Sequence, residues 1–194
     1  MYRGAEKLEN NAYIADIPFT TISHNKRFGI IDNDTLYEPN RSLTRAEFIK
    51  MIVRALACKY EFIGTQSSFN DVNPDEWYAE YITFAEQAGW IHGYGKNEFR
   101  PNAPISRSEV ALVLTRILSL HKADIVKEQI YTDIHETQPF SHAVLTLTQY
   151  GVIDGQEING QRMYRPNDAM LRSEIAKVLV NIFLKDIKKK TISQ

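Results

Sequence analysis

Apolar residues recur at helical spacing in three stretches of the chain. In each stretch they are three and four residues apart, which places them on one face of an α-helix. The matched positions are Phe48, Met51, Ile52, Ala55 and Leu56, then Val110, Val113, Leu114, Ile117 and Leu118, and then Ile175, Val178, Leu179, Ile182 and Phe183. Every matched position is apolar, so the sequence predicts three equivalent amphipathic helices.

The same short motif precedes each predicted helix. An aromatic-x-Pro-Asn turn is followed, at one fixed distance, by the arginines Arg45, Arg107 and Arg172. Self-similarity of this kind indicates tandem repeats. Because a single repeat cannot bury its apolar face alone, we expect the three helices to pack on each other around a pseudo-threefold axis.

Two of the three predicted helices begin with a capping box. Thr44 stands three residues before Glu47, and Ser106 stands three residues before Glu109. Each hydroxyl can accept a hydrogen bond from the amide of its glutamate, whose side chain accepts one from the amide of the cap. Leu171 occupies the third capping position, so that helix start should be weaker by about 1 kcal/mol.

The second repeat carries the most complete pattern ahead of its motif helix. An aromatic-x-Asp-Val segment ends at Asp71 and Val72, and Trp77 opens a further apolar stretch. We expect Gly89 to end that stretch in the left-handed conformation and Gly93 to form a second tight turn.

The other two repeats keep part of this pattern. In the third, Asp133, Gly151 and Gly155 stand at the matched positions, and Pro139-Phe140 stands in place of Trp77-Tyr78. In the first, a short helix is expected within residues 13–29, opening near Pro18. The second repeat is therefore the only one in which the whole pattern is present.

The order of these elements resembles a known family. Aromatic-x-Asp-Val, Trp-Tyr, Gly-x-Ile-x-Gly, Phe-x-Pro and Ile-Ser/Thr-Arg-x-Glu, repeated in this way over about residues 11–186, are similar to the surface-layer homology module, usually found as three copies. The resemblance implies an all-α fold of three helix-loop-helix repeats around a central three-helix bundle. The implied segments are a lead or linker at 1–12, repeats at 13–62, 66–122 and 129–188, and a polar tail at 189–194.

What the resemblance implies for function is non-covalent attachment to the bacterial cell wall. Modules of this family hold extracellular surface-layer proteins and exoenzymes by binding an acidic, often pyruvylated, secondary cell-wall polysaccharide, so a linked cargo or surface-layer domain is expected. The implied ligand cations are Arg45, Arg107 and Arg172, and the implied groove residues are Asp71, Trp77, Gly93 and Asp133. Arg107 and Trp77 are expected to act together as cation and sugar platform.

The chemistry of these residues agrees with that role. A guanidinium can grip a carboxylate with two parallel hydrogen bonds. The start of a helix favours an anion through its free amides and its dipole. Tryptophan and tyrosine offer flat apolar faces to a sugar ring.

Structural alternatives remain open for the same residues. The arginines can form salt bridges with neighbouring acids, Trp77 can belong to the core, and Asp71 and Asp133 can cap the turns that follow them. A protein-interaction or assembly scaffold that has lost its sugar site is therefore the alternative function.

Composition narrows the classes of partner. The 194 residues include 23 Lys and Arg against 24 Asp and Glu, so no overall charge draws the chain to nucleic acid or to an anionic membrane. No apolar run has the length of a membrane span, and the N-terminus has no apolar leader. Either the chain is not exported, or it is the mature or excised part of a larger protein.

Motifs for metals, cofactors and catalysis do not emerge from the pattern. The histidines lack the helical zinc spacing, and Asp32-Asn33-Asp34 lacks the central glycine of a calcium loop. Cys58, the single cysteine, cannot form an internal disulfide and fits a buried helix face. Since no activated nucleophile or paired carboxylates can be recognised, an enzyme is the least favoured class and no cofactor is assigned.

Overall fold

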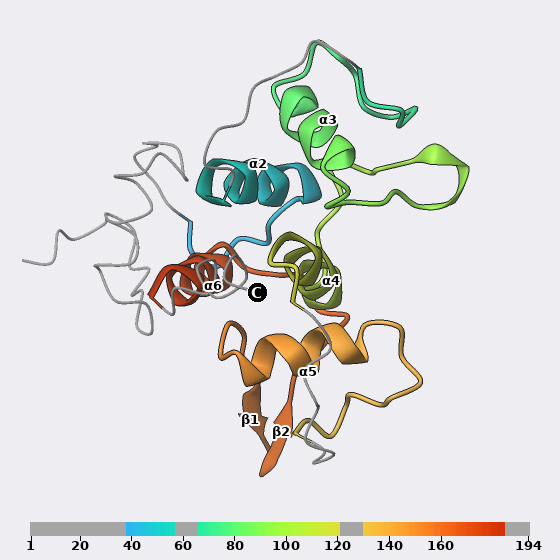
Figure 1. The fold of residues 1–194 in the computed structure, drawn as a ribbon. Helices are drawn as coiled ribbons and strands as arrows, with labels where there is room; N and C mark the ends of the chain where they lie inside the picture. Colours follow the sequence, from blue (N-terminus) through green and yellow to red (C-terminus); the bar gives the residue numbers. More distant parts are fainter. Residues whose placement is uncertain (1–37, 57–65, 121–129, 185–194) are drawn as a thin grey trace, which may run out of the picture.

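The described part of the chain is mostly helical (Figure 1). The computed structural model describes residues 38–56, 66–120 and 130–184. Within these ranges the helices are α2 (Arg45–Leu56), α3 (Ala79–Gln87), α4 (Arg107–Ile117), α5 (Ser141–Gln149) and α6 (Arg172–Leu184), with a short 3₁₀ turn η1 (Gly95–Asn97). The helix expected near Pro18 and the residue Cys58 lie outside them.

A small β-hairpin corrects the all-α expectation. Strand β1 (Gln156–Ile158) pairs antiparallel with β2 (Gln161–Met163). The two residues between the strands, Asn159 and Gly160, have positive φ angles of 51° and 74°. An Asn-Gly pair favours this kind of two-residue hairpin turn, so the signal was present in the sequence.

The three motif helices begin at the predicted arginines, and their caps follow the predicted pattern. Ser106 and Glu109 form a complete capping box. Thr44 Oγ1 accepts from the Glu47 amide at 3.2 Å, and Glu47 Oε2 accepts from the Thr44 amide at 2.9 Å. At the third helix start only the second half is available, in which the Leu171 amide donates to a motif glutamate at 2.9 Å.

A ring of backbone hydrogen bonds joins the segments that lead into these helices. The Leu43 amide donates to Met170 O at 2.9 Å, the Ile105 amide to Leu43 O at 3.0 Å, and the Met170 amide to Ile105 O at 2.8 Å. All three residues are at most 2% exposed. The ring therefore links three distant parts of the sequence inside one core.

A second set of bonds, donated two residues further along the chain, joins the same three segments in the opposite direction. The first amide of each motif helix donates to a carbonyl of a neighbouring repeat rather than to solvent. The bonds run from Arg45 to Ala103 O (2.9 Å), from Arg107 to Asp168 O (2.9 Å) and from Arg172 to Arg41 O (3.0 Å). Helix starts leave unpaired amides, so these contacts both satisfy the helices and hold the repeats together.

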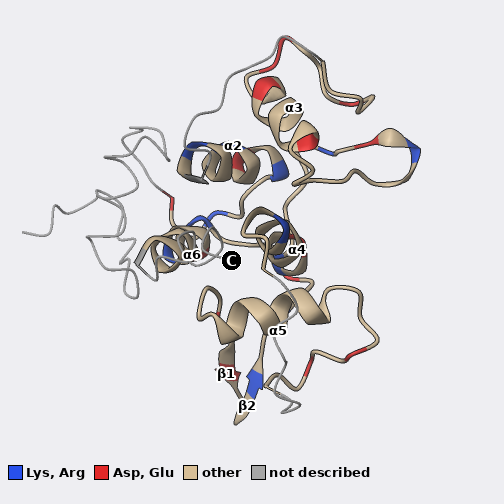
Figure 2. Cartoon of the chain, in the orientation of Figure 1, with Lys and Arg blue, Asp and Glu red and all other residues tan. Residues whose placement is uncertain are grey.

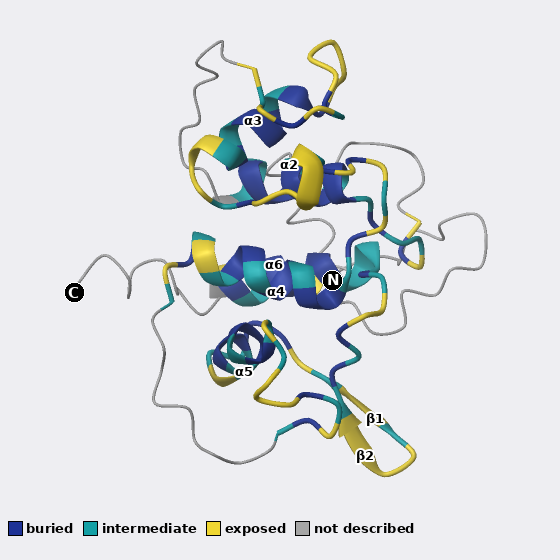
Figure 3. Ribbon diagram, turned by 90° about the vertical axis from the view of Figure 1, so that its right-hand side faces the viewer, coloured by how far each residue is buried: buried dark blue, intermediate teal, exposed yellow. Residues whose placement is uncertain are grey.

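The predicted apolar faces form much of the core. Most of their residues are buried, whereas Ala55 and Ile117 are half-buried. Phe183 is an exception at 37% exposed, which corrects its assignment to the buried face. Figure 3 shows the buried surfaces of α4 and α6 and the exposed hairpin of β1 and β2.

Helices of successive repeats make the main helix-to-helix contacts. Helix α3 packs on α2, and α5 packs on α4 (Figure 1). In the described ranges no helix combines the length and apolarity needed to cross a bilayer.

Candidate functional site

Two motif arginines point into the body of the protein. Arg45 and Arg107 are each only 6% exposed. The Nε of Arg45 donates to Phe99 O at 2.8 Å, and the Nε of Arg107 donates to Tyr164 O at 2.7 Å. Each guanidinium also lies over the ring of that same aromatic residue, at 4.6 and 4.7 Å from the centroid. Both side chains are therefore held by the turn of the following repeat.

Each motif arginine also meets the motif glutamate of another repeat. The three pairs are Arg45 with Glu109 at 2.9 Å, Arg107 with Glu174 at 2.5 Å, and Arg172 with Glu47 at 3.5 Å. The pairs form a closed cycle that joins the same three segments as the ring of backbone bonds. The salt bridges considered as an alternative from the sequence are thus present.

The first cleft, of about 200 Å³, lies beside Arg45 and one face of α4. Gly93, Tyr94, Glu109 and Arg116 contribute to its lining. The Tyr94 hydroxyl donates to Glu109, and the Arg45 guanidinium lies 4.7 Å from the Tyr94 ring centroid. Burial, together with the hydrogen bond to Glu109, raises the pKa of Tyr94, so its hydroxyl remains a donor.

Arg116 lies in the last turn of α4 and lines the same cleft. Its Nη1 donates to Trp90 O at 3.3 Å. Burial lowers the pKa of this guanidinium without removing its charge. Among the described residues, no carboxylate forms an ion pair with Arg116.

The second cleft, of about 590 Å³, lies beside Arg107 and α6. Glu174, Lys177, Asn181 and Asp154 contribute to its lining. Arg107 Nη2 donates to Asp154 O at 3.0 Å, and the side chain of Asn181 donates to a loop carbonyl. This cleft therefore contains carboxylates as well as cations.

The carboxylate of Asp154 is itself stabilised as an anion. Burial alone would raise its pKa, but hydrogen bonds from Arg162 at 2.6 Å and from the Gly155 amide hold the pKa below its usual value. The second cleft consequently keeps a negative charge at its loop wall.

The third arginine, Arg172, is accompanied by a second guanidinium. Arg41 donates to both carboxylate oxygens of Glu47, at 3.1 and 2.5 Å.

Asp71 and Asp133 support the turns that hold the arginines. The two oxygens of Asp71 accept from the amides of Phe99 and Arg100, at 2.7 and 2.6 Å. Those of Asp133 accept from the amides of Tyr164 and its neighbour Arg165, at 2.8 and 2.7 Å. Because Phe99 and Tyr164 supply the carbonyls for Arg45 and Arg107, both aspartates act behind the clefts.

Gly93 lines the first cleft, but its role in the backbone differs from the predicted tight turn. Gly89 has the expected positive φ, at 69°, whereas Gly93 has none. A Cβ at Gly93 would meet Phe69 Cε1 at 2.4 Å and Glu98 O at 2.6 Å. Close packing of the loop is therefore the reason for glycine at this position.

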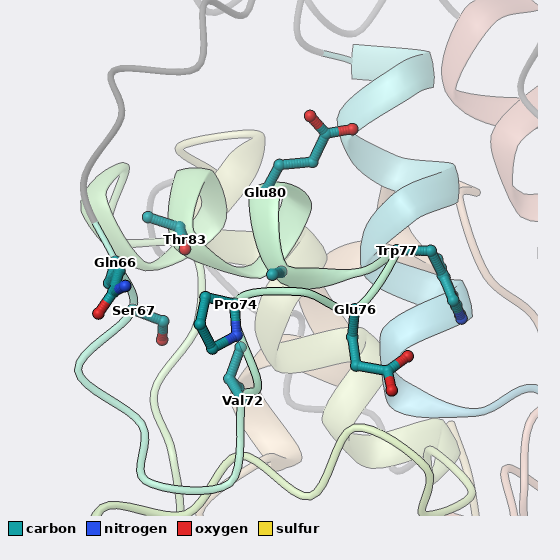
Figure 4. Close-up of a pocket in the computed structure, with 9 residues that line it drawn as sticks. Gln66, Ser67, Val72, Pro74, Glu76, Trp77, Glu80 and Thr83 are labelled. Carbon is teal, nitrogen blue, oxygen red and sulfur yellow. The ribbon is translucent and has the colours of Figure 1, made fainter.

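The structure does not bring Trp77 and Arg107 into one cleft. Trp77 is 49% exposed and borders a separate pocket of about 310 Å³, close to Pro74 and Glu80. Figure 4 shows its ring turned toward α2, away from Pro74. Lys50 Nζ lies 5.2 Å from the Trp77 ring centroid.

The charges of the described chain are mixed rather than gathered on one face. Figure 2 shows basic and acidic residues interspersed along the helices and loops. Nor do the described ranges contain a group of three or more His, Cys, Asp or Glu side chains able to hold a metal ion. The local lining of each cleft therefore decides what it can bind.

Two residues of the first cleft were missed by sequence reasoning. Tyr94 lies just before η1 and forms an isolated bridge with Glu98, where an aromatic residue has no periodic signal. Arg116 follows the motif arginine at the same interval as Arg54 and Asn181 follow theirs, so alignment of the repeats beyond the motif would have marked this position.

Comparison with known proteins agrees with this architecture. Residues 68–111 and 130–176 match the S-layer homology domain family. The chain therefore carries S-layer homology domains in these two segments, which confirms the resemblance found in the sequence.

Similar segments occur in much larger proteins. The chain is 33% identical to the amylopullulanase of Thermoanaerobacterium thermosulfurigenes over 78% of its length, and 29% identical to the Surface-layer 125 kDa protein of Lysinibacillus sphaericus over 77%. It is 51% identical to the Endo-1,4-beta-xylanase A of Thermoanaerobacterium saccharolyticum over 40%. The aligned parts cover only 8%, 13% and 6% of these three proteins.

Proposed function

We propose that this chain is a non-catalytic carbohydrate-binding module that attaches a protein non-covalently to the outer surface of a bacterial cell wall. The observation that carries this proposal is that the family segment forms a small part of proteins with unlike names, one of them a surface-layer protein. A segment shared by a surface-layer protein and two enzymes is better explained by a common location than by a common reaction. A cargo domain elsewhere in a longer protein belongs to the same proposal.

The proposed architecture is three repeats around a central bundle of α2, α4 and α6. The ring formed by Leu43, Ile105 and Met170 supports it, because each repeat both donates to one neighbour and accepts from the other. The arginine–glutamate pairs join the same three segments in a cycle that runs in the opposite donor-to-acceptor direction.

The proposed ligand is an acidic, pyruvylated secondary cell-wall polysaccharide, bound in the clefts between repeats. Arg45, Arg107 and Arg172 lie at helix starts, where the helix dipole favours an anion although the first amides are already paired with carbonyls. The Nη2 of Arg45 makes no hydrogen bond to any described residue, so a carboxylate can approach it. In this proposal Gly93 lines the first cleft, and Trp77 offers a separate sugar contact. Asp71 supports the wall of the first cleft and Asp133 that of the second.

Binding to purified wall sacculi tests the proposal. The full chain should sediment with sacculi and lose this binding after hydrofluoric acid has removed the polysaccharide. Arg45→Lys keeps a charge but loses the planar fork, so it should weaken binding, whereas Lys96→Gln removes an exposed charge outside the cleft and should not. Equal binding to stripped sacculi would contradict the proposed ligand.

One observation favours a second candidate, a protein-interaction or assembly scaffold. The motif arginines are already paired with glutamates, as expected if their role is to hold the fold. In that case the chain would not bind sacculi, and analytical ultracentrifugation would show self-association that persists in Arg45→Lys.

A further inference from the structure

Arg116 differs from the motif arginines in the charged groups that surround it. Arg45, Arg107 and Arg172 each face a glutamate, whereas Arg116 has no carboxylate partner among the described residues. Its hydrogen bond to Trp90 O leaves most of its donors unused, since a guanidinium carries five. Arg116 is exposed at the edge of the cleft, so its remaining donors can reach an anion from solution.

The carboxylate closest in sequence on the same face of α4 is fully engaged elsewhere. Glu109 and Arg116 are seven residues apart, which places them on one face about 10 Å apart along the axis. Glu109 accepts from Arg45 Nη1 and from Tyr94 through one oxygen, and from the Ser106 amide and hydroxyl through the other. Its carboxylate oxygens are thus taken by other donors, and Glu109 makes no ion pair with Arg116.

The matched residue in the third repeat separates the structural role of this position from its charge. Asn181 Nδ2 donates to Val152 O at 3.1 Å, the same bond that Arg116 makes to Trp90 O. Val152 and Trp90 both follow the glycine that ends the preceding helix. A neutral amide is thus sufficient to hold the loop, so the charge of Arg116 is not needed for the fold.

The linings of the two clefts differ accordingly. In the first cleft Arg45 and Arg116 face a single carboxylate, that of Glu109. In the second cleft two cations, Arg107 and Lys177, face two carboxylates. The first cleft has a surplus positive charge that the second lacks.

We propose that Arg116 is the residue that selects a carboxylate-bearing sugar in the first cleft. In the second cleft, where Asn181 takes its place, we expect the preference for the acidic sugar to be weaker. Identification of the anion as the acidic group of a wall glycan rests on the proposed function, but the selection of carboxylate over neutral sugar does not.

Two small probes test the inference on the full chain. One is an amino sugar carrying a pyruvate ketal, and the other is the same amino sugar without the ketal. Titration calorimetry should show that the wild-type protein prefers the acidic probe. Arg116→Asn, which installs the residue found at position 181, should reduce affinity for the acidic probe about tenfold to a hundredfold, because a charge-assisted pair is lost. The affinity for the neutral probe should not change.

Further variants separate a loss of binding from a loss of folding. Lys96→Gln removes one positive charge from the same repeat without touching the cleft and should bind as the wild type does. Asn181→Arg, combined with Arg116→Asn, should restore the preference for the acidic probe at the second cleft. Urea unfolding midpoints for all variants check that each one is folded.

The possible results separate this inference from the proposed function. If Arg116→Asn binds the acidic probe as well as the wild type does, or if the wild type has no preference, the inference is wrong even when sacculi are bound. If the preference depends on Arg116 but sacculi are not bound, the inference holds and the wall-anchoring function fails.

Discussion

The first and second clefts share one frame and differ in their linings. In both, a buried arginine reaches the turn of the next repeat, an aspartate supports that turn from behind, and a glycine lets the loop pack closely. The first cleft adds Tyr94 and Arg116, whereas the second has Gln156 and Asn181 at those positions.

Comparison of the two clefts separates the residues that stabilise the fold from those that only line a cleft. The motif arginine and glutamate recur because they close the cycle between repeats, and their charges largely satisfy each other. Residues on the cleft side of the motif helix are free to vary without loss of those contacts. Ligand preference is therefore expected to reside in the variable positions, as proposed for Arg116.

The largest expected effect comes from removing the arginine of each cleft. Arg107→Met should cost about 3–5 kcal/mol of unfolding free energy, because Glu174 and two carbonyls lose their donor. Arg45→Met should cost less, since it releases one carbonyl and one carboxylate. Urea denaturation followed by circular dichroism measures both. Arg162→Met, on the exposed hairpin, serves as a control, and an equal loss there would contradict the argument.

The glycine contacts predict a smaller effect that is alike in the two clefts. Gly93→Ala and Gly155→Ala should each lose about 1–3 kcal/mol, because the new Cβ would lie 2.4 Å from an aromatic carbon. Gly95 has open space around its Cβ position, so Gly95→Ala should stay within about 0.5 kcal/mol of the wild type. Thermal unfolding of the three variants is the measurement, and a neutral Gly93→Ala would show that the loop can move away.

The helix caps differ between the second repeat, which has Ser106, and the third, which has Leu171. Ser106→Ala should lose about 1 kcal/mol by removing the hydroxyl half of a capping box. Leu171→Thr adds that hydroxyl where only the glutamate half exists and should gain several tenths of a kcal/mol, up to about 1. Chemical denaturation should therefore show shifts of opposite sign. Shifts of the same sign would mean that lost packing of Leu171 outweighs the cap.

The smallest expected effect concerns the third pair and its dependence on pH. Burial raises the pKa of Glu47, but hydrogen bonds from Arg41 and the Thr44 amide, with the charges of Arg41 and Arg172, outweigh burial and leave the pKa below its usual value. A lowered pKa in the folded state contributes stability above the unfolded pKa of about 4.3, and this is lost as the pH falls through the folded value. Glu47→Gln should therefore lose less stability on acidification from about pH 5 to pH 3 than the wild type does.

A matched glutamate controls for general acid effects. Glu76 makes no hydrogen bond or ion pair through its side chain with any described residue, so Glu76→Gln should follow the wild-type acid response. Unfolding midpoints measured across this pH range test the pair. Parallel curves for Glu47→Gln and Glu76→Gln would contradict the role assigned to Glu47.

The sequence predicted the helices of the motif well, because their signals are local. Spacing of apolar residues and the Ser106–Glu109 box are both read within a few positions, and the structure has these helices where they were expected. The helix-ending role of Gly89 was predictable for the same reason.

The site was less predictable because its contacts are made between repeats. Nothing near Arg45 in sequence indicates that its side chain meets Glu109, and nothing near Gly93 shows that Phe69 occupies the space of a Cβ. Trp77 had the right chemistry for a sugar platform, but its position beside α2 rather than Arg107 depends on how α3 packs.

The hydrogen-bonded ring has a consequence for biosynthesis. Two of its links need Met170, which is near the end of the described chain, so they cannot form until a ribosome has made almost all of this sequence. Until then the Leu43 amide and the Ile105 carbonyl lack the partners that Met170 supplies. A nascent chain would accordingly lack these two links, and the ring would close only after the segment around Met170 has been made.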